Sequence, residues 1–297
     1  MLFIYNPYAG RSKIRLLLSS IIELFVENGF EVVTYSTLKA KDATRIVQEC
    51  LGRGKYDILV CSGGDGTLNE VISGVLSVGK EIEVGYIPAG TTNDFAYSLG
   101  LPKNIMASAK IVLDGQPFLC DIGNLNGQYF SYTAAFGIFT DASYETPQTT
   151  KNTLGRLAYI LEGIKRLPKW KSHHIRITCG ERVVEDNFIY GMVTNSSSVG
   201  GFKGITGKDV LLDDGLFEGV FIKAPQNVLD IQTIINDLLH VNIKSKHIFF
   251  LPVKEMSLVS RETISWTLDG EYGGKFKKVQ IKNLKKAIPL IRKKNNK

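Results

Sequence analysis

The stretch LVCSGGDGTLNEV, from Leu59 to Val71, combines residue types that bind phosphate groups. A strongly apolar run ends at Cys61, and glycines then surround Asp65 before a helix-like pattern begins. Glycines between a strand and a helix let backbone N–H groups point into a concavity, and the helix start adds partial positive charge. Phosphate oxygens fit there, and a metal ion or an acceptor hydroxyl could reach Asp65. The alternative is a tight strand-to-helix connection with an incidental acid.

Two further polar loops strengthen the phosphate interpretation. Asn6–Gly10 (NPYAG) is an ordinary turn by itself, and Gly90–Asp94 (GTTND) by itself would pass for a helix N-cap. Each of these loops follows a predicted strand, as the loop at Gly63 does. The patterns GxxxxGK[ST] and GxGxxG after a strand are both missing from the chain, so a nucleotide must be bound by another type of motif.

The elements that position these loops alternate in type along the N-terminal part of the chain. Short apolar runs occur at Leu2–Tyr5, Glu31–Tyr35, Ile58–Cys61 and Val84–Ile87. Amphipathic stretches lie between and after them, at Ser12–Asn28, Lys41–Arg53, Leu68–Val78 and Asn104–Leu113. This alternation predicts a parallel sheet with helices on both faces. Because ligands of such sheets bind beyond the carboxyl ends of the strands, the three loops are expected at one rim.

The pattern changes near Pro117–Asp121. Beyond this point, segments that alternate like antiparallel strands predominate, and only Thr153–Leu167 and Gln226–His240 look helical. We therefore predict an α/β protein of two domains, a nucleotide-binding domain at 1–119 and a mainly antiparallel β-sandwich domain at 120–285. The run AIPLI in the lysine-rich tail predicts a last strand by which 286–297 returns to the first domain.

Bulk composition indicates a folded protein and limits its partners. The 297 residues are 44% hydrophobic and 22% charged, and the four cysteines form no CxxC pair. This favours a reducing compartment over a disulfide framework or a zinc site. We find neither a signal peptide nor the run of about 18 apolar residues that a membrane span needs, which predicts a cytoplasmic protein. The net charge of +7 leaves an anionic partner open. The basic residues are scattered and not interleaved with aromatics, which argues against nucleic acid.

At this point the motifs define a family resemblance. GGDGTLNEV followed by PAGTTNDFA resembles the catalytic domain of the diacylglycerol and sphingosine kinases, in particular the soluble bacterial diacylglycerol kinases. The resemblance continues through CDIGNLN, YFSYTAAFG, SYETP, VTNSSSVGGF, LLDDGLFE and LDGEYGG, nearly to the end of the chain. The triad GGD also occurs in NAD kinases and phosphofructokinases, so the first domain is expected to have that kind of fold.

The resemblance implies a set of ATP-site residues. These are Asn6, Pro7, Tyr8, Ala9, Gly10, Thr37, Gly63, Gly64, Asp65, Gly66, Thr67, Leu68, Asn69 and Thr91. Asp65 would also face the phosphates and the catalytic magnesium ion.

The resemblance also implies a general base and a structural magnesium site. Glu271 in LDGEYGG would take the proton from the acceptor hydroxyl. The carbonyls of Leu211 and Leu216 and the carboxylate of Asp214 would bind structural Mg²⁺, and Asp121 would connect with that site through waters. Without the resemblance, LLDDGLFE is only an Asp-Gly turn.

Residue spacing gives separate expectations for the acids and histidines. In an extended strand, Asp269 and Glu271 would lie on one face, since they are two residues apart; a hairpin turn with surface acids is the commoner alternative. The adjacent His173 and His174 would face opposite ways and could not hold one metal ion together.

A basic cluster around Leu167 and Trp170 suits an anionic membrane face. A solvated helix end is the equal alternative for this cluster, which consists of Lys165, Arg166, Lys169 and Lys171.

The sequence thus predicts an ATP- and magnesium-dependent lipid kinase that docks transiently on the inner membrane face and converts diacylglycerol into phosphatidic acid. The acyl chains would lie in a cleft between the domains, and a homodimer is an open alternative to a monomer. Other acceptors remain: a sphingoid base, another lipid alcohol or NAD. A non-catalytic lipid- or nucleotide-sensing module is the alternative from another class, although such a module needs no base.

Overall fold

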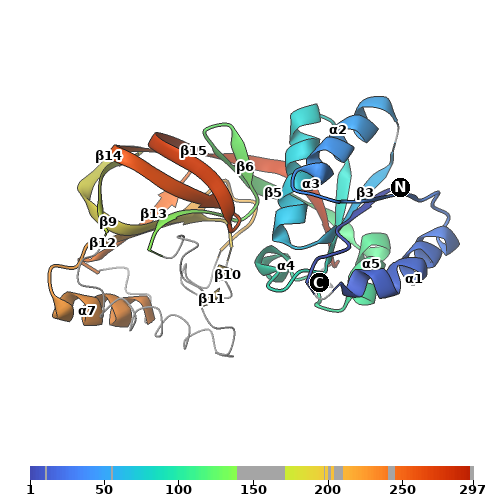
Figure 1. Ribbon diagram of the computed structural model, residues 1–297, viewed down its shortest axis with the longest axis horizontal. Helices are drawn as coiled ribbons and strands as arrows, with labels where there is room; N and C mark the ends of the chain where they lie inside the picture. The colour runs from blue at the N-terminus through green and yellow to red at the C-terminus, as the bar shows by residue number, and fades with distance from the viewer. Residues whose placement is uncertain are drawn as a thin grey trace. The chain divides into compact units, whose positions relative to one another are not determined.

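The computed structural model describes residues 1–10, 12–54, 56–138, 171–196, 198–199, 202–203, 210–239 and 245–294 (Figure 1). The predicted helix Thr153–Leu167, the SYETP motif and the basic cluster up to Trp170 lie outside the described residues. The chain divides into two compact units. Unit 1 contains Met1–Ile122 and Leu284–Lys297, and unit 2 contains Gly123–Asn283. Strands β5 (Gln116–Leu125) and β15 (Glu271–Arg292) each contribute residues to both units.

Unit 1 contains the predicted parallel sheet. Its strands are β1 (Leu2–Tyr5), β2 (Val33–Ser36), β3 (Ile58–Gly63) and β4 (Glu83–Pro88). They pair in parallel in the order β4-β3-β1-β2. The C-terminal part of β15 pairs with β4, with Leu290 opposite Val84, so the AIPLI segment is a strand next to β4.

Helices cover both faces of this sheet (Figure 1). They are α1 (Lys13–Glu27), α2 (Asp42–Arg53), α3 (Asp65–Val78), α4 (Asp94–Ser98) and α5 (Ile105–Asp114). On one face, Phe25 of α1 and Val112 of α5 pack with Val60 of β3 in one apolar core. On the other, α2 approaches α3 closely at Gly74, where an added Cβ would lie 2.7 Å from Val47 Cβ.

Two details of unit 1 differ from the sequence expectation. Helix α3 begins at Asp65 and not at Leu68, so the acid of the glycine loop lies in the first helical turn. Helix α4 was not predicted. It is 5 residues long, which is too short to show the apolar periodicity from which helices are inferred.

Unit 2 is built from antiparallel strands and one described helix. The strands other than β5 and β15 are β6 (Gln128–Phe130), β7 (Thr133–Gly137), β8 (His173–Cys179), β9 (Arg182–Thr194), β10 (Ser198–Val199), β11 (Phe202–Lys203), β12 (Phe217–Lys223), β13 (Ile248–Val253) and β14 (Glu255–Leu268). The pairings among β7, β8, β9, β12, β13 and β14, and those of β5 with β6, β10 with β11 and β14 with β15, are antiparallel. Helix α7 (Val228–Leu239) corresponds to the predicted segment Gln226–His240.

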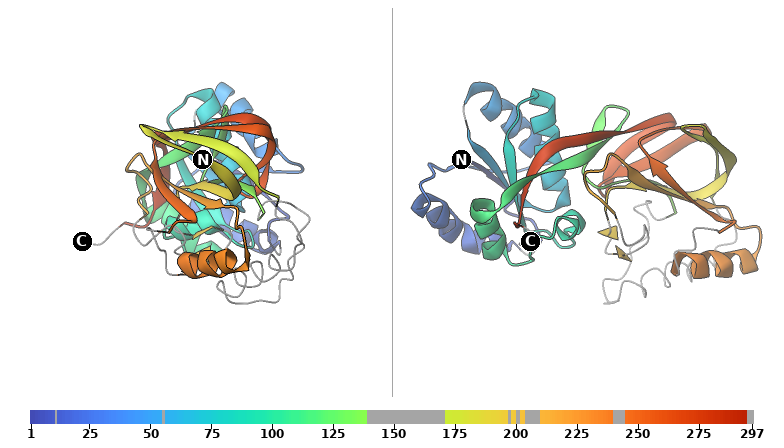
Figure 2. Two further views of the ribbon diagram at one scale, coloured as in Figure 1. Left: turned by 90° about the vertical axis from the view of Figure 1, so that its left-hand side faces the viewer. Right: turned by 180° about the vertical axis from the view of Figure 1, so that it is seen from behind.

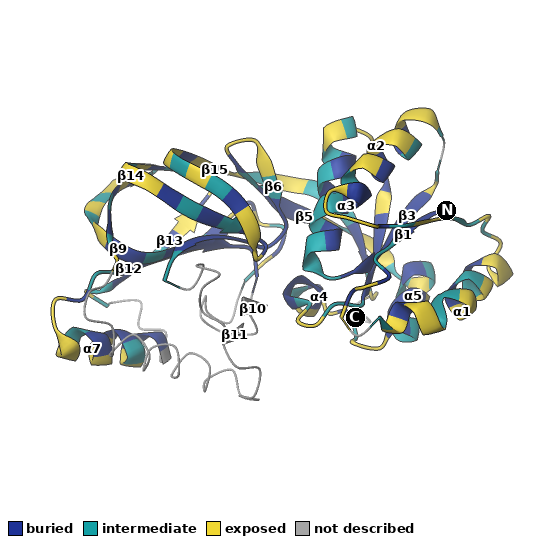
Figure 3. Ribbon diagram, viewed as in Figure 1, coloured by how far each residue is buried: buried dark blue, intermediate teal, exposed yellow. Residues whose placement is uncertain are grey.

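Two long strands organise the core of unit 2. Strands β9 and β14 each pair with β8 over one half of their length and with β7 over the other. Figure 2 shows how the long strands curve, and Figure 3 shows buried and exposed residues alternating along β14 and β15. The enclosed core holds Phe136 and Trp266, whose ring centroids are 4.9 Å apart.

The two adjacent histidines of β8 point to opposite sides, as predicted. His173 is buried, and its Nδ1 lies 2.5 Å from Glu262 Oε1, whereas the partly exposed His174 contacts Glu185. The described residues contain no cluster of three or more His, Cys, Asp or Glu side chains that could hold a metal ion. No helix in the described part of the chain is long and apolar enough to span a bilayer.

Candidate active site

The three loops predicted at one rim are in direct contact within unit 1. Gly63 O accepts the N–H groups of Ala89 at 2.8 Å and Gly90 at 3.2 Å. A Cβ on Gly90 would lie 2.6 Å from Gly64 Cα, and a Cβ on Gly10 would lie 2.5 Å from Ala89 O. The backbones therefore approach too closely for side chains at these glycines. Since β1, β3 and β4 end here, the loops meet at the carboxyl ends of three neighbouring strands.

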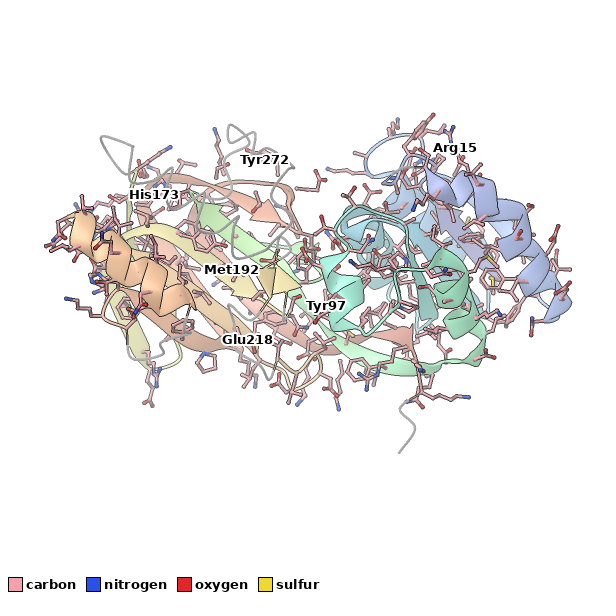
Figure 4. All side chains as sticks on the ribbon, turned by 90° about the horizontal axis from the view of Figure 1, so that it is seen from below. Arg15, Tyr97, His173, Met192, Glu218 and Tyr272 are labelled. Atoms are coloured by element: carbon pink, nitrogen blue, oxygen red, sulfur yellow. The ribbon has the colours of Figure 1, made fainter. Side chains whose placement is uncertain are left out.

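The first loop is held by Asn6. Its backbone N–H donates to Ser62 O at 2.8 Å, and its Oδ1 accepts the N–H of Tyr8 at 2.9 Å. Pro7 and Ala9 are buried, whereas the Tyr8 side chain is exposed and lies 4.5 Å from the guanidinium of Arg15. The loop thus presents an aromatic ring and a cation to solvent (Arg15 is labelled in Figure 4).

The glycine loop leads directly into α3. Gly64 is the N-cap residue and makes no side-chain cap bond, so the helix start is suited to an anionic ligand. Gly66 and Asn69 are half-buried at this end of the helix, and Thr67 is buried. The side chain of Leu68 is fully buried and its N–H donates to Gly64 O. Leu68 therefore contributes to the apolar core, and its main-chain donor is used by the helix.

Asp65 forms a contact that its position in the sequence did not indicate. Its Oδ2 accepts the N–H of Asp94 at 3.0 Å, and its Oδ1 accepts the N–H of Phe95 at 3.3 Å. These two donors are the first residues of α4, so the carboxylate caps that helix. It thereby links the glycine loop to the loop that carries the exposed Thr91.

Thr37 is buried at the end of β2, and its N–H donates to Tyr5 O at 2.9 Å. The residues after it are fixed by Asp42, whose Oδ2 accepts the N–H groups of Leu38 and Lys39 at 2.9 and 3.0 Å. The Leu38 hydrogen bond is the main reason that the pKa of Asp42 lies below its usual value. Thr37 therefore lies next to β1 on a backbone segment that these hydrogen bonds fix in place.

Glu70, at the end of the GGDGTLNE run, has a structural role that sequence reasoning did not assign. Its carboxylate accepts the N–H groups of Lys41 at 2.7 Å and Ala43 at 3.1 Å, and its carbonyl accepts the Thr44 hydroxyl. It thus fixes the start of α2 from a neighbouring helix. In the sequence, the only indication of this role is that Glu70 is an acid close to the glycine loop. The residues that it binds are far away along the chain, so the sequence did not reveal the contact.

In unit 2, Glu271 is the first residue after a tight hairpin turn. Strand β14 ends at Leu268, which pairs with Glu271, and the two turn residues Asp269 and Gly270 have φ angles of 50° and 84°. Such angles define the two-residue turn that joins twisted antiparallel strands. The expectation that Asp269 and Glu271 share one face of an extended strand is therefore wrong. Asp269 is 5% exposed, whereas Glu271 is exposed to solvent.

Asp269 is surrounded by main-chain donors. Its carboxylate accepts the N–H groups of Ser131 at 2.6 Å, Tyr132 at 3.0 Å and Thr133 at 2.9 Å. Burial raises the pKa of Asp269 to about 6, although these hydrogen bonds act in the opposite direction. The carboxylate is thus mainly ionised at neutral pH, and the hydrogen bonds from these main-chain N–H groups stabilise its charge.

The LLDDGLFE segment forms the turn before β12. Asp214 Oδ1 accepts the N–H of Leu216 at 2.8 Å, which is the turn chemistry of an Asp-Gly sequence. The side chains of Leu211 and Leu216 are exposed. Because these side chains carry no oxygen, only the carbonyl groups of the two residues could hold a hard cation.

Glu218, which is labelled in Figure 4, is the second residue of β12, the strand that follows this turn. Its Oε2 is buried and has no hydrogen-bond partner in the described part of the chain. Burial, and secondarily the charge of Asp214, raises the pKa of Glu218 to about 7. An orphaned carboxylate oxygen beside a carboxylate and carbonyl groups fits a divalent cation.

Asp121, the predicted water-linked partner of the metal site, is completely buried in unit 1. Its Oδ1 accepts the N–H of Lys286 at 2.7 Å. It therefore fixes the C-terminal segment on the N-terminal sheet unit, and its link to a metal ion stays a prediction.

A parallel sheet with helices on both faces and with glycine loops at its strand ends places unit 1 in the α/β class whose ligands bind beyond the carboxyl ends of the strands. The comparisons with known proteins narrow this class. The family model described as the diacylglycerol kinase catalytic domain matches residues 1–125. The chain is 35% identical over 272 residues to the diacylglycerol kinase of Bacillus subtilis, covering 91% of this chain and 89% of that protein. It is 34% identical over 290 residues to the diacylglycerol kinase of Staphylococcus saprophyticus, covering 97% and 93%.

A solved structure agrees with these relatives. The crystal structure of a protein provisionally described as a diacylglycerol kinase from Bacillus anthracis superimposes with a TM-score of 0.82 at 26% identity, covering 98% of this chain and 94% of that one. The chain belongs to the diacylglycerol kinase family. This confirms the family predicted from the motifs and the mixed α/β fold with many antiparallel strands.

Proposed function

We propose that the protein transfers the γ-phosphoryl group of ATP to the free hydroxyl of diacylglycerol and so produces phosphatidic acid and ADP. The observation that carries this proposal is the family similarity over nearly the whole chain, together with the convergence of its three motif loops at one rim. The curated relatives named above carry the diacylglycerol kinase name, which does not favour a sphingoid-base kinase or a non-catalytic module.

ATP binds to unit 1 in this proposal, on a phosphofructokinase- and NAD kinase-like arrangement of the sheet. Its phosphates lie against the start of α3 and the loops at Asn6 and Thr91. The uncapped helix start and the backbone contacts among the glycines support this position. Asp65 keeps the Gly90 loop in place through the start of α4 and faces the phosphates.

The β-rich unit 2 supplies the base and a metal site. In phosphoryl transfer, the protein mainly positions the reactants and stabilises the charge of the transition state. An alcohol acceptor also needs a base within hydrogen-bond reach. Glu271 takes the proton of the acceptor hydroxyl. The carbonyls of Leu211 and Leu216 and the carboxylate of Asp214 would hold structural Mg²⁺, and Asp121 would be linked to it through waters. A second Mg²⁺, near Asp65, would neutralise the phosphate charge when bound.

The acceptor is a lipid, so the protein meets its substrate at a membrane. The net charge of +7 supports transient docking on the anionic inner membrane face. Unit 2 takes the lipid, and the protein acts as a monomer or a homodimer.

An acceptor panel tests the proposal. Radiolabelled ATP is supplied with Mg²⁺ and with diacylglycerol, sphingosine or NAD, each lipid presented in anionic micelles. Labelled phosphatidic acid as the dominant product supports the proposal. Preferential labelling of sphingosine or NAD, or ATP binding without transfer to any acceptor, would overturn it. Glu271→Gln is the matched inactive control, expected to bind ATP normally.

A further inference from the structure

The hairpin that carries Glu271 is fixed at its turn by a buried carboxylate. Asp269 is 5% exposed and accepts three successive backbone N–H groups, from Ser131, Tyr132 and Thr133. Its own N–H donates to Thr133 O at 2.8 Å. Four hydrogen bonds thus join one turn residue to Ser131–Thr133, the segment that connects β6 to β7 and includes the first residue of β7.

Glu271 follows this hydrogen-bonded turn directly, so fixing the turn also restrains the backbone of Glu271. Only Gly270 separates the two acids, and both turn residues have left-handed φ angles. Leu268, before the turn, pairs with both Ala134 and Glu271. The backbone of Glu271 is therefore held in register with β7 through β14.

A second contact holds the other strand of the hairpin. Gln128 Nε2 of β6 donates to Gly273 O at 2.9 Å. Tyr272, between Gly273 and Glu271, is 68% exposed (Figure 4). An exposed carboxylate and an exposed phenol thus project from a turn whose backbone is anchored on both sides.

The donor set requires a carboxylate at position 269. Its two oxygens provide enough lone pairs for three N–H donors, whereas an asparagine has one acceptor oxygen and would turn its NH₂ group towards an N–H. The Ser131 side chain also hydrogen-bonds this carboxylate.

We propose that Asp269 is a positioning residue for the phosphoryl-transfer reaction: it clamps the hairpin to Ser131–Thr133 and so sets the orientation of the Glu271 carboxylate. This inference rests on the proposed function, in which Glu271 is the general base. Asp269 itself does not contact the substrate. Because a catalytic group displaced by about 1 Å can lose about 10²-fold in rate, a loosened turn affects turnover rather than ATP binding.

The test compares Asp269→Asn, Glu271→Gln and the double variant in the full-length chain, with diacylglycerol in anionic micelles. We expect Asp269→Asn to lower kcat about 10- to 100-fold with an unchanged KM for ATP. Because Asp269 acts through Glu271, adding Asp269→Asn to Glu271→Gln lowers kcat no further. A purely structural role predicts that the two losses multiply.

Asp237→Asn is the matched control. Asp237 lies on α7 and is also 5% exposed, and its Oδ2 accepts the hydroxyl of Ser245 at 2.6 Å. Its substitution should lower the thermal midpoint and leave kcat unchanged. Should Asp269→Asn fail to fold, Gln128→Ala loosens the same hairpin from its other side, with an expected loss of about threefold to tenfold in kcat and none in ATP affinity.

The outcomes separate this inference from the proposed function. An inactive Glu271→Gln beside a fully active Asp269→Asn, or beside a fully active Gln128→Ala, would overturn the positioning role alone. Multiplying losses in the double variant would do the same. A fully active Glu271→Gln would remove Glu271 as the base, and the positioning role with it.

Discussion

The carboxylate of Asp65 accepts the backbone N–H of Asp94 at 3.0 Å. Asp65 opens α3 and Asp94 opens α4, so one acid connects the starts of two helices that follow neighbouring strands. The proposed phosphate site is therefore one hydrogen-bonded unit, in which a change at one loop is transmitted to the next.

We predict that Asp65→Asn lowers both stability and activity, to different extents. An asparagine can accept one of the two N–H groups, so the loss of stability should be about 1 kcal/mol. The loss of negative charge beside the phosphates and their metal ion should lower kcat by about 10²-fold or more. Urea unfolding and a steady-state kinase assay measure the two effects.

Asp230→Asn is a control for this helix-start effect. Asp230 accepts the N–H of Gln226 at 2.8 Å in the first turn of α7. The Asp230→Asn variant should lose a similar amount of stability and keep normal turnover. If Asp65→Asn retains full turnover, Asp65 is only a helix-capping residue.

We predict that Gly90→Ala weakens ATP binding. The added Cβ would meet Gly64 Cα at 2.6 Å and push two of the loops apart. We expect about tenfold weaker ATP binding, which corresponds to about 1.4 kcal/mol. Gly52→Ala is the matched substitution, since no described atom lies within 4 Å of its Cβ position inside α2. That variant should gain up to about 1 kcal/mol in stability. Equal ATP affinity in both variants would contradict contact among the loops at this site.

We predict that Asp214→Asn changes how Mg²⁺ acts on the protein. If Asp214 binds a structural ion, millimolar Mg²⁺ should raise the thermal midpoint of the wild type, because a ligand that binds only the folded state stabilises it. The variant should lose this rise at the same Mg²⁺ concentration and recover part of its activity at higher concentrations. Thermal unfolding without ATP detects the ion independently of turnover. An identical Mg²⁺ response in both proteins would remove Asp214 from the metal site.

We predict a pH-dependent contribution of Asp269 to stability. Its pKa is about 6 in the folded protein and about 3.8 without the fold. The folded state therefore keeps the proton that the unfolded chain has already released, and stability falls as pH rises from about 4 to about 6. At about 1.4 kcal/mol per pKa unit, the change amounts to at most about 3 kcal/mol, and the contribution is constant above pH 6.

Urea unfolding of the wild type and Asp269→Asn over this pH range isolates the effect, because other titrating groups cancel in the difference. The difference in the free energy of unfolding should shift in favour of Asp269→Asn as pH rises. A difference that stays flat between pH 4 and pH 6 would show that Asp269 keeps its ordinary pKa.

The sequence by itself determined the parallel strands of unit 1, the three loops at their ends and the family. These features are local: strand periodicity, glycine spacing and motif order can all be read from neighbouring residues. Only the tertiary structure decided what the acids do. Asp65 caps α4 and Glu70 fixes α2, whereas Asp269 is buried and Glu271, two residues later, is exposed. The N–H groups named above as donors to the carboxylates of Asp65, Glu70 and Asp269 lie 27 to 138 positions away along the chain. Identical carboxylates thus acquire different roles, because burial and donor N–H groups are supplied by segments that meet only in the folded chain.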